Sequence, residues 1–223
     1  MDLDAVTELV LRAFDQHWGK AEDACATSPL LVSLTGVPGA GKSTLVTVMV
    51  DKLNALRPTC AAISFGIDGY HRRREELSAD EIERRGAPDT FDAKKLLCDL
   101  LKLKKSGTLD APSFDHEFGD PVEADIKIQR KNRIVIVEGL YLLLKTSLQW
   151  TEVSNLFDVK IFLNVELDVA TSRVARRHMK AWNWDMTKAL DRARRNDFTN
   201  ALLVESTKSA ADLIVQSIDN SGL

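Results

Sequence analysis

The chain has 223 residues, 30 basic and 33 acidic side chains, a formal net charge of −3 and 44% hydrophobic residues. The length predicts one domain over residues 1–223 with a full α/β core, and the near-neutral charge gives no general attraction for nucleic acid, so no nucleic-acid partner is expected. No segment is long and apolar enough to span a bilayer, so no membrane partner is expected either.

The first 28 residues are expected to contain an amphipathic helix packed on the domain. Leu3, Val6, Val10, Phe14 and Trp18 recur at helical spacing. We assign this segment a structural role.

Residues 36–44 carry the most informative motif of the chain. After an apolar strand-like run at 30–34 they read GVPGAGKST, a complete GxxxxGK[S/T] phosphate loop. Such glycines let successive backbone N–H groups surround a β-phosphate, while the lysine reaches the β and γ oxygens and the serine ligates Mg²⁺. We therefore expect ATP and Mg²⁺ as cofactors. The predicted nucleotide-binding residues are Gly36, Val37, Pro38, Gly39, Ala40, Gly41, Lys42, Ser43 and Thr44.

The rest of the chain alternates strand-like and helical segments. Further apolar runs lie at 60–65, 134–137, 159–163 and 211–215, mostly separated by helical patterns. This alternation predicts a three-layer α/β/α fold with a mostly parallel five-stranded sheet. Ser78 followed by Glu81 is a capping box, and Asp92 precedes a second helix that ends near Gly107. Residues 111–132 predict a small hairpin outside the sheet.

Acidic residues follow two of the predicted strands. In open parallel sheets, ligands bind at the carboxyl ends of strands, where Asp68 and Glu138 stand. A hydroxyl that attacks a phosphate needs a carboxylate to accept its proton, which suits Asp68, and Mg²⁺ needs a second anchor besides Ser43, which suits Glu138. The Asp-Gly pair at Asp68 is also a common turn former, so a structural role there remains an alternative.

Residues 168–197 are rich in arginine and are expected to form a helical lid. Arg173, Arg176 and Arg177 stand at i, i+3 and i+4, so their guanidinium groups can converge on transferred phosphate. We expect Arg173 or Arg177 to neutralise charge in the transition state. A solvated helical face is the alternative for any such run. Trp182 and Trp184 either stack on adenine or pack against the helices.

The order of these motifs resembles the phosphoribulokinase/uridine kinase family of P-loop kinases over residues 30–215. The similarity rests on GVPGAGKST, IDGYH, RRGAPDTFDA, APSFDHEFGDPV, IVIVEGLYLLL and the arginine-rich helices. The resemblance is greatest to small bacterial and fungal kinases related to uridine and pantothenate kinases.

This resemblance implies the positions that would bind the phosphate acceptor. Asp68 would be the base, Tyr70 and His71 would line the acceptor pocket, and residues 84–91, including Arg85 and Phe91, would close over it. Asp115 and His116 either fix a turn or touch the substrate.

The three cysteines, Cys25, Cys60 and Cys98, bear on the cell compartment. They are far apart, odd in number and without CxxC spacing, which argues against disulfides and a zinc site. Each lies in an apolar run and is expected to be a reduced core thiol. The acidic first residues are unlike a targeting signal, so we expect a cytoplasmic protein.

The sequence is compatible with three functions. The first is a Mg-ATP-dependent kinase that phosphorylates a hydroxyl of a small metabolite such as a sugar, a nucleoside or a pantothenate-like compound. The second is a kinase for an acceptor that is already phosphorylated, suggested by arginines at 72–74 and 84–85. The third is a nucleotide-dependent switch, although the chain lacks the NKxD motif of GTPases. The oligomeric state is open, a homodimer included.

Overall fold

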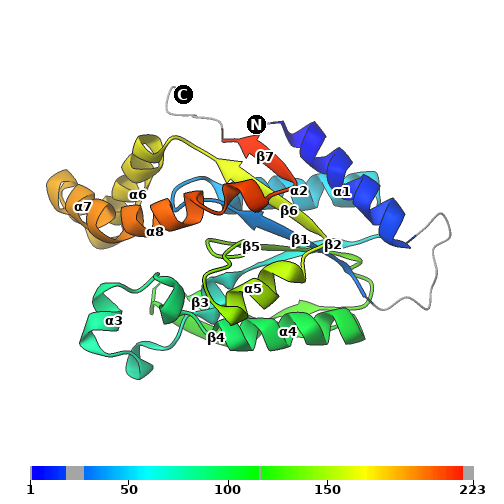
Figure 1. Cartoon of the computed structure of the whole chain (residues 1–223), viewed down its shortest axis with the longest axis horizontal. Helices are drawn as coiled ribbons and strands as arrows, with labels where there is room; N and C mark the ends of the chain where they lie inside the picture. Colours follow the sequence, from blue (N-terminus) through cyan, green and yellow to red (C-terminus); the bar gives the residue numbers. More distant parts are fainter. Residues whose placement is uncertain (1, 19–27, 116, 218–223) are drawn as a thin grey trace.

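A central parallel sheet with helices on both faces forms the body of the protein. The computed structural model describes residues 2–18, 28–115 and 117–217. Helices α1 (Leu3–Trp18) and α2 (Lys42–Leu56) cover one face, and α4 (Ala93–Ser106) and α5 (Leu148–Asn155) lie on the other (Figure 1). Within the described residues, no helix has the length and apolar character needed to cross a membrane. This arrangement confirms the predicted α/β/α fold.

The sheet has five parallel strands in the order β2-β5-β1-β6-β7. Every residue of β1 is buried, because helices cover both faces, and this explains the continuous apolar runs in the sequence. The strands match all five predicted runs with small shifts at their ends. Their bounds are β1 Leu30–Thr35, β2 Ala62–Gly66, β5 Ile134–Gly139, β6 Val159–Asn164 and β7 Leu213–Gln216.

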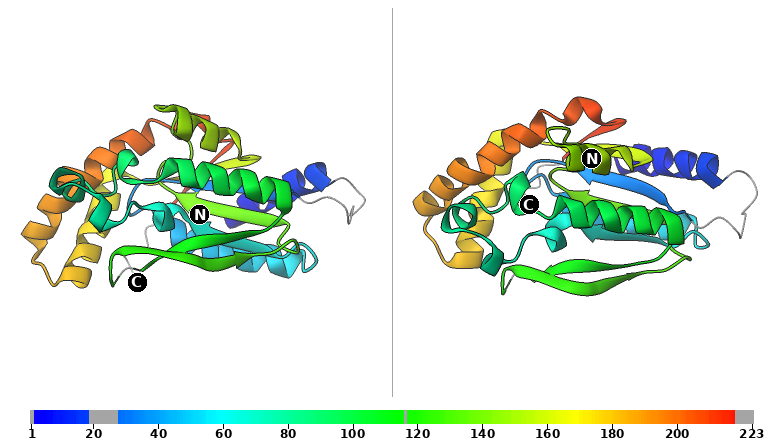
Figure 2. Two further views of the ribbon diagram at one scale, coloured as in Figure 1. Left: turned by 90° about the horizontal axis from the view of Figure 1, so that it is seen from below. Right: turned by 60° about the horizontal axis from the view of Figure 1, so that its bottom comes forward.

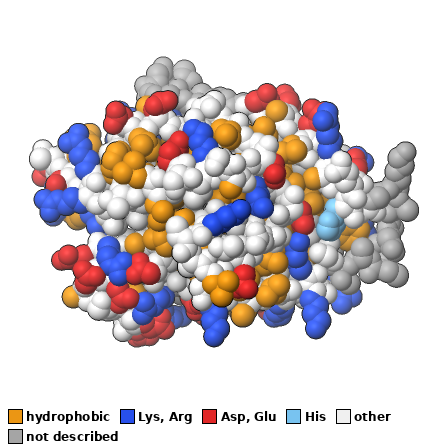
Figure 3. All heavy atoms as spheres, viewed as in Figure 1, with side chains coloured by type: hydrophobic (Ala, Val, Ile, Leu, Met, Phe, Trp, Pro, Cys, Tyr) orange, Lys and Arg blue, Asp and Glu red, His pale blue; other side chains and the backbone are white. Residues whose placement is uncertain are grey.

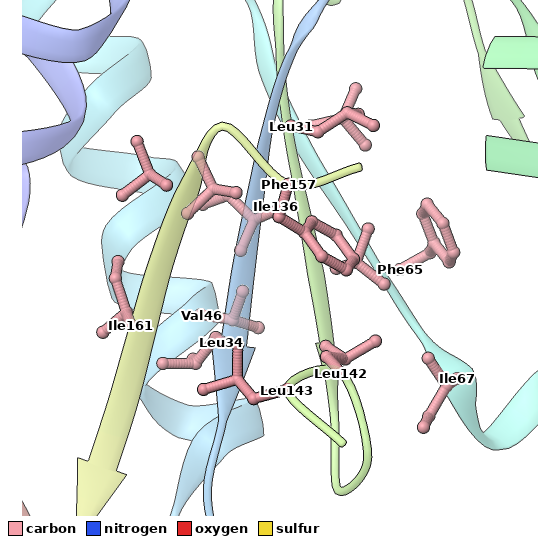
Figure 4. Packing of buried hydrophobic residues seen from close by; sticks show 14 of the residues in the cluster. Leu31, Leu34, Val46, Phe65, Ile67, Ile136, Leu142, Leu143, Phe157 and Ile161 are labelled. Carbon is pink, nitrogen blue, oxygen red and sulfur yellow. The ribbon is translucent and has the colours of Figure 1, made fainter. Parts of the chain in front are cut away.

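The hydrophobic core lies on both sides of this sheet. Figure 4 shows Leu31, Ile136 and Ile161 on strands β1, β5 and β6, with Val46 contributed by α2 and Leu142 by the loop after β5. Complete burial of one such side chain stabilises the fold by about 1.5–3 kcal/mol. The sheet is therefore a rigid support for the loops at its carboxyl edge.

The register of the sheet brings three chain segments to one level at this edge. Leu34 and Gly66 both lie beside Glu138, and Thr35 lies beside Gly139. The phosphate-loop motif starts directly after Thr35, and Asp68 follows two residues after Gly66. The sheet therefore places the candidate catalytic segments next to one another.

Two helices begin where the capping signals predict. The Ser78 hydroxyl accepts a hydrogen bond from the Glu81 N–H at the start of α3 (Ala79–Glu83). The Asp92 carboxylate accepts from the Lys95 N–H at the start of α4, so Asp92 is a helix cap. Helix α4 ends at Gly107, whose φ of 69° suits glycine.

The predicted hairpin is present and packs beneath the sheet edge. It consists of β3 (Leu109–Asp115) and β4 (Asp120–Ile128), so it starts two residues before the predicted segment. It packs against the 3₁₀ turn η1 (Ile67–Tyr70), where a Cβ on Gly69 would lie 2.3 Å from the Pro112 carbonyl oxygen. The hairpin therefore supports the segment that carries Asp68.

The C-terminal helices lie at the end of the molecule toward which the strands point. Helices α6 (Leu167–Trp182) and α7 (Met186–Arg192) project there, close to the α3 segment (Figures 1 and 2). A π-helical turn at Ala193–Asp197 then leads into α8 (Phe198–Glu205). The segment predicted as a lid is helical, whereas α5 and α8 were not anticipated.

One prediction about the cysteines is wrong. Cys60 is buried, as expected, but Cys98 is exposed on α4. The buried face of α4 carries Leu96, Leu100 and Leu103, and position 98 falls on the opposite face. Cys25 lies outside the described residues.

Candidate active site

The phosphate loop has a backbone that only glycine accommodates at its critical positions. Gly39 and Gly41 have φ values of 80° and 94°, in the left-handed region. A Cβ on Gly39 would lie 2.4 Å from the Ala170 carbonyl oxygen, and one on Gly36 would lie 2.7 Å from that of Leu163. The motif glycines are therefore required by the turn and by the close packing of strand β6 and helix α6.

Lys42 begins α2 and points back along the loop. Its Nζ donates hydrogen bonds to the carbonyl oxygens of Gly36 (2.9 Å) and Val37 (3.2 Å). Burial lowers the pKa of Lys42 to about 8, although the nearby carboxylates of Glu138 and Asp68 oppose the shift. A poorly solvated ammonium at a helix N-terminus is a binding site for a phosphate-like anion.

Ser43 and Glu138 form the candidate magnesium site. The Ser43 hydroxyl donates to Glu138 Oε2 over 3.2 Å, and burial raises the pKa of the Glu138 carboxyl. Within the described residues, no three His, Cys, Asp or Glu side chains gather as a metal site. Mg²⁺ is commonly held by one or two protein groups together with substrate phosphates and water. The pair therefore fits a nucleotide-bound Mg²⁺ and does not form a complete metal site by itself.

Asp68 is exposed at the carboxyl edge, on the turn after β2. Its carbonyl oxygen accepts from the His71 N–H (3.1 Å) and lies 2.9 Å from His71 Nδ1, so the turn has a fixed shape. Burial lowers the pKa of His71 below its usual value of 6.5, so its imidazole is neutral at pH 7.

A cavity of about 210 Å³ joins these segments. The phosphate loop, Asp68 and Glu138 line it together with side chains from the 84–91 loop and from the C-terminal helices. Its lining residues are Pro38, Gly39, Lys42, Ser43, Gly66, Asp68, His71, Gly86, Phe91, Glu138, Gly139, Leu140, Arg177, Asp197 and Asn200. Of the predicted acceptor residues, the structure places His71 and Phe91 here, with ring centroids 3.9 Å apart.

Tyr70 lies outside the cavity, contrary to the expected acceptor pocket, and Asp115 takes the turn-forming role that was one of its two predicted alternatives. Tyr70 is only 1% exposed, and its hydroxyl donates to Asp99 Oδ2 on α4, because the 3₁₀ turn points successive side chains in different directions. The Asp115 carboxylate accepts from the N–H groups of Glu117 and Phe118 and so fixes the hairpin turn. His116 lies outside the described residues.

Arg85 also points away from the cavity. It pairs with Asp120 of the hairpin (2.7 Å) and donates to the Arg72 carbonyl oxygen (2.8 Å). Arg72 pairs with Glu81, and Arg84 pairs with Asp80 and Asp89. Figure 3 shows basic and acidic side chains mixed over this α3 region. These arginines join the α3 segment to its surroundings.

The two candidate catalytic arginines occupy different positions. Arg177 lines the cavity, whereas Arg173 donates to the Ser217 hydroxyl (3.0 Å) and to the Gly39 carbonyl oxygen (3.4 Å). The Ser217 hydroxyl in turn donates to the Ala40 carbonyl oxygen. Arg173 therefore connects α6 to the back of the phosphate loop and to the end of β7.

The two tryptophans at the tip of these helices pack together. The Trp182 ring centroid lies 4.5 Å from that of His178 and 4.6 Å from that of Trp184. Neither tryptophan is among the residues that line the cavity. The packing interpretation of the two indoles is therefore the one that the structure favours.

The sequence interpretation missed Asp197 and Asn200. Asp197 ends the π-helical turn, and Asn200 follows in α8, where it is 6% exposed. The signal for Asn200 is weak: a single amide on the buried face that also carries Ala201 and Val204. The signal for Asp197 depends on a π turn, which helical periodicity does not predict.

The fold and this site define a P-loop nucleotide-binding protein of the kinase type. The chain belongs to the Phosphoribulokinase / Uridine kinase family, whose profile matches residues 31–222. Membership implies the general use of ATP and Mg²⁺ by a phosphotransferase. The family resemblance noted in the sequence is thus confirmed.

Individual relatives agree with this assignment. A Schizosaccharomyces pombe protein provisionally named a uridine kinase is 40% identical over 198 residues, which span 85% of this chain and 83% of the relative. A Silicibacter sp. TM1040 structure provisionally named a fructose transport system kinase has a TM-score of 0.85 and 29% identity, covering 96% of this chain and 99% of that chain. D-glycerate 3-kinase from Cryptococcus neoformans shares the fold, with a TM-score of 0.68 and 16% identity over 92% of this chain and 87% of that chain.

Proposed function

We propose that this protein is a Mg-ATP-dependent kinase that phosphorylates a hydroxyl group of a small metabolite. The observation that carries the proposal is the shared cavity: Asp68 lines the same cavity as Lys42 and the phosphate loop. A base for an attacking hydroxyl and a cradle for a phosphate are the two parts that phosphoryl transfer requires.

The residues present fit a nucleoside triphosphate with its magnesium ion. The glycine backbone of the loop leaves room for a close phosphate contact, Lys42 provides a partly buried cation, and Ser43 with Glu138 would hold the metal. When bound, Mg-ATP supplies the phosphoryl group and the metal charge that stabilises it.

Asp68 has the position and chemistry of the general base. Its carboxylate faces the cavity, and among the described residues no side chain donates a hydrogen bond to it. In the proposed reaction Asp68 orients the acceptor hydroxyl and accepts its proton. The hydroxyl oxygen is thereby prepared to form the new bond to phosphorus.

Arg177 is the lid arginine that this geometry favours for the transferred group. It projects from α6 into the cavity, while Arg173 holds the same helix against the phosphate loop. A guanidinium that reaches the phosphate when the segment 168–197 closes would stabilise charge that develops in the transition state. We propose that this segment acts as the lid.

The paired arginines weigh against an acceptor that is already phosphorylated. That alternative needs free guanidinium groups beside the acceptor, but Arg72, Arg84 and Arg85 each form ion pairs with carboxylates of the same region. None of the arginines at 72–74 and 84–85 is among the residues that line the cavity. Of the side chains that line the cavity, those that carry a positive charge at pH 7 are Lys42 and Arg177, which the nucleotide phosphates would engage.

The test is ADP release from Mg-ATP with and without a panel of sugars, nucleosides, pantothenate and sugar phosphates. Strong stimulation by one compound in the wild type, lost in Asp68→Asn, would support the kinase. Asp110→Asn is the matched control, because Asp110 is an exposed hairpin carboxylate that pairs with Lys127. Tight ATP binding without stimulation by any compound would move the assignment toward a nucleotide-dependent switch.

A further inference from the structure

The part of the cavity away from the phosphate loop is acidic and polar. Asp68 reaches it from the turn after β2, Asp197 from the π-helical turn and Asn200 from α8. A carboxylate only accepts hydrogen bonds, whereas an amide both donates and accepts. Together these groups can bind several hydroxyl groups of one molecule.

The cation that reaches the acceptor side is Arg177, whose charge acts on Asp197 together with that of Arg192, and its proposed role is to bind the transferred phosphate. The cations that line the cavity are Lys42 at the phosphate loop and Arg177 from α6, and the His71 imidazole beside Asp68 is neutral at pH 7. A carboxylate or phosphate group on the acceptor would lie near Asp68 and Asp197 and near the nucleotide phosphates. Repulsion between like charges in a partly desolvated cavity is costly, so such a compound would be rejected.

Asp197 is held in this position by its surroundings. The π-helical turn at Ala193–Asp197 displaces the backbone, and Asn196 anchors the turn by donating to the Arg85 carbonyl oxygen over 3.0 Å. His178 Nε2 lies 3.7 Å from Asp197 Oδ2 behind the cavity wall. An irregular turn of this kind is frequent at functional sites.

Asn200 lies next to Gly86 of the 84–91 loop. A Cβ added to Gly86, whose φ is +106°, would lie 3.6 Å from Asn200 Nδ2. The Gly86 carbonyl oxygen is fixed by the Tyr141 hydroxyl over 2.6 Å. Within the described part of the chain, no hydrogen bond to the Asn200 side chain is found, although the residue is buried. Its amide atoms are not among the buried polar atoms of the described residues that lack a partner, so they reach the space of the cavity, where a ligand group can bond to them.

We infer that the phosphate acceptor is a small uncharged polyhydroxylated compound whose non-reacting hydroxyl groups are bound by Asp197 and Asn200. This inference rests on the proposed kinase function. The cavity of about 210 Å³ is lined by the phosphate loop as well as by these residues, so the acceptor would share it with the nucleotide phosphates.

The experiment compares acceptors that share a carbon skeleton but differ in charge: aldoses, the corresponding aldonates and the corresponding sugar phosphates, with nucleosides and nucleotides as a second series. ADP release gives kcat and KM for each at saturating Mg-ATP. The variants are Asp197→Asn and Asn200→Ala, with Asp110→Asn as the matched control on the exposed hairpin. ATP affinity and the thermal unfolding midpoint are measured for each variant.

The inference predicts that the uncharged member of a series has the highest kcat/KM. Loss of a hydrogen bond to a charged group costs enough to raise KM about tenfold, so Asp197→Asn should raise acceptor KM by that factor with kcat little changed. Asp197→Asn should also reduce the ratio of kcat/KM for the aldose to that for the aldonate, because the substitution removes a negative charge that repels the aldonate. Asn200→Ala should raise KM without reducing the preference for the aldose over the aldonate, and Asp110→Asn should change neither quantity.

Two outcomes overturn the inference while leaving the kinase intact. The first is that an aldonate or a sugar phosphate has the highest kcat/KM and that this activity is lost in Asp68→Asn. The other is an unchanged acceptor KM in both Asp197→Asn and Asn200→Ala, with normal ATP affinity. If no compound stimulates ADP release although ATP binds, the proposed function fails first, and the inference falls with it. If Asp197→Asn is unfolded, Asn200→Ala decides.

Discussion

The two sides of the cavity are built in different ways. The phosphate side comes almost entirely from one continuous segment, Gly36 to Ser43, whose backbone and Lys42 face the same space. The acceptor side is assembled from four separate segments: the turn after β2, the 84–91 loop, the π-helical turn and α8.

The difference follows from what each side binds: the triphosphate is the same in every kinase, whereas the acceptor varies between kinases. A triphosphate presents the same oxygens in every kinase, so local backbone N–H groups and one lysine are sufficient to recognise it. An acceptor is recognised by side chains whose identities and positions depend on the packing of distant segments.

The largest effect is expected from removing the cation of the phosphate side. Lys42→Ala should lower kcat/KM by roughly 10³-fold, because Lys42 would contribute to both nucleotide binding and transition-state charge. ATP titration and ADP release would measure the two losses separately. Lys102→Ala, an exposed change on α4, is the control. Normal ATP affinity in Lys42→Ala would contradict the phosphate-loop assignment.

A change on the acceptor side should separate binding from turnover. Asp68→Asn removes the proposed base and keeps its shape, so turnover should fall by roughly 10²-fold or more. ATP affinity should stay within a few-fold of the wild type, since Asp68 is not part of the phosphate loop. Unchanged turnover with the best acceptor would assign Asp68 to the Asp-Gly turn alone.

The depressed pKa of Lys42 gives a smaller and pH-dependent effect. The protonated ammonium binds phosphate, and its pKa in the free protein is about 8, below the ordinary 10.5. ATP affinity should therefore be highest below pH 7 and fall by about fivefold between pH 8 and pH 9, as the free lysine loses its proton. Lys42→Arg, which stays charged, should abolish this slope in ATP titrations at pH 7, 8 and 9. A slope that persists in Lys42→Arg would exclude Lys42 as its source.

The smallest effect is expected from the hydrogen bond that holds Gly86 on the acceptor side. Tyr141→Phe removes the hydrogen bond to Gly86 and should cost about 1 kcal/mol of folding free energy, or roughly 2–4 °C in Tm. It should also raise acceptor KM a few-fold, because Gly86 lines the cavity.

Tyr70→Phe is the matched variant for this test. It also loses a buried hydroxyl hydrogen bond, to Asp99, but Tyr70 lies outside the cavity lining. Its Tm should fall while acceptor KM stays constant. Equal changes of KM in both variants would mean that Gly86 has no special place in acceptor binding.

The sequence predicted the fold well because its signals are local. Apolar runs mark strands buried on both faces, Ser78 and Asp92 cap the helices that they precede, and the glycines of the phosphate loop fit its left-handed backbone. Sequence position also indicated Asp68 and Glu138, since residues after parallel strands share one sheet edge.

The acceptor residues were predicted less well, because adjacency in sequence does not fix the direction of a side chain. Tyr70 and His71 are neighbours, yet one is buried against α4 and the other lines the cavity. Arg85 was expected at the acceptor and is instead paired with Asp120 of the hairpin, 35 residues further along the chain.

The sequence by itself determined the nucleotide side of this protein: a P-loop in an α/β fold, with its lysine, serine and glycines in fixed order. Only the tertiary structure decided which side chains face the acceptor, because the π-helical turn that presents Asp197 and the packing that brings Asn200 opposite Gly86 arise from contacts between segments more than 100 residues apart. Backbone turns are encoded by neighbouring residues, whereas a side-chain pocket is encoded by the fold as a whole.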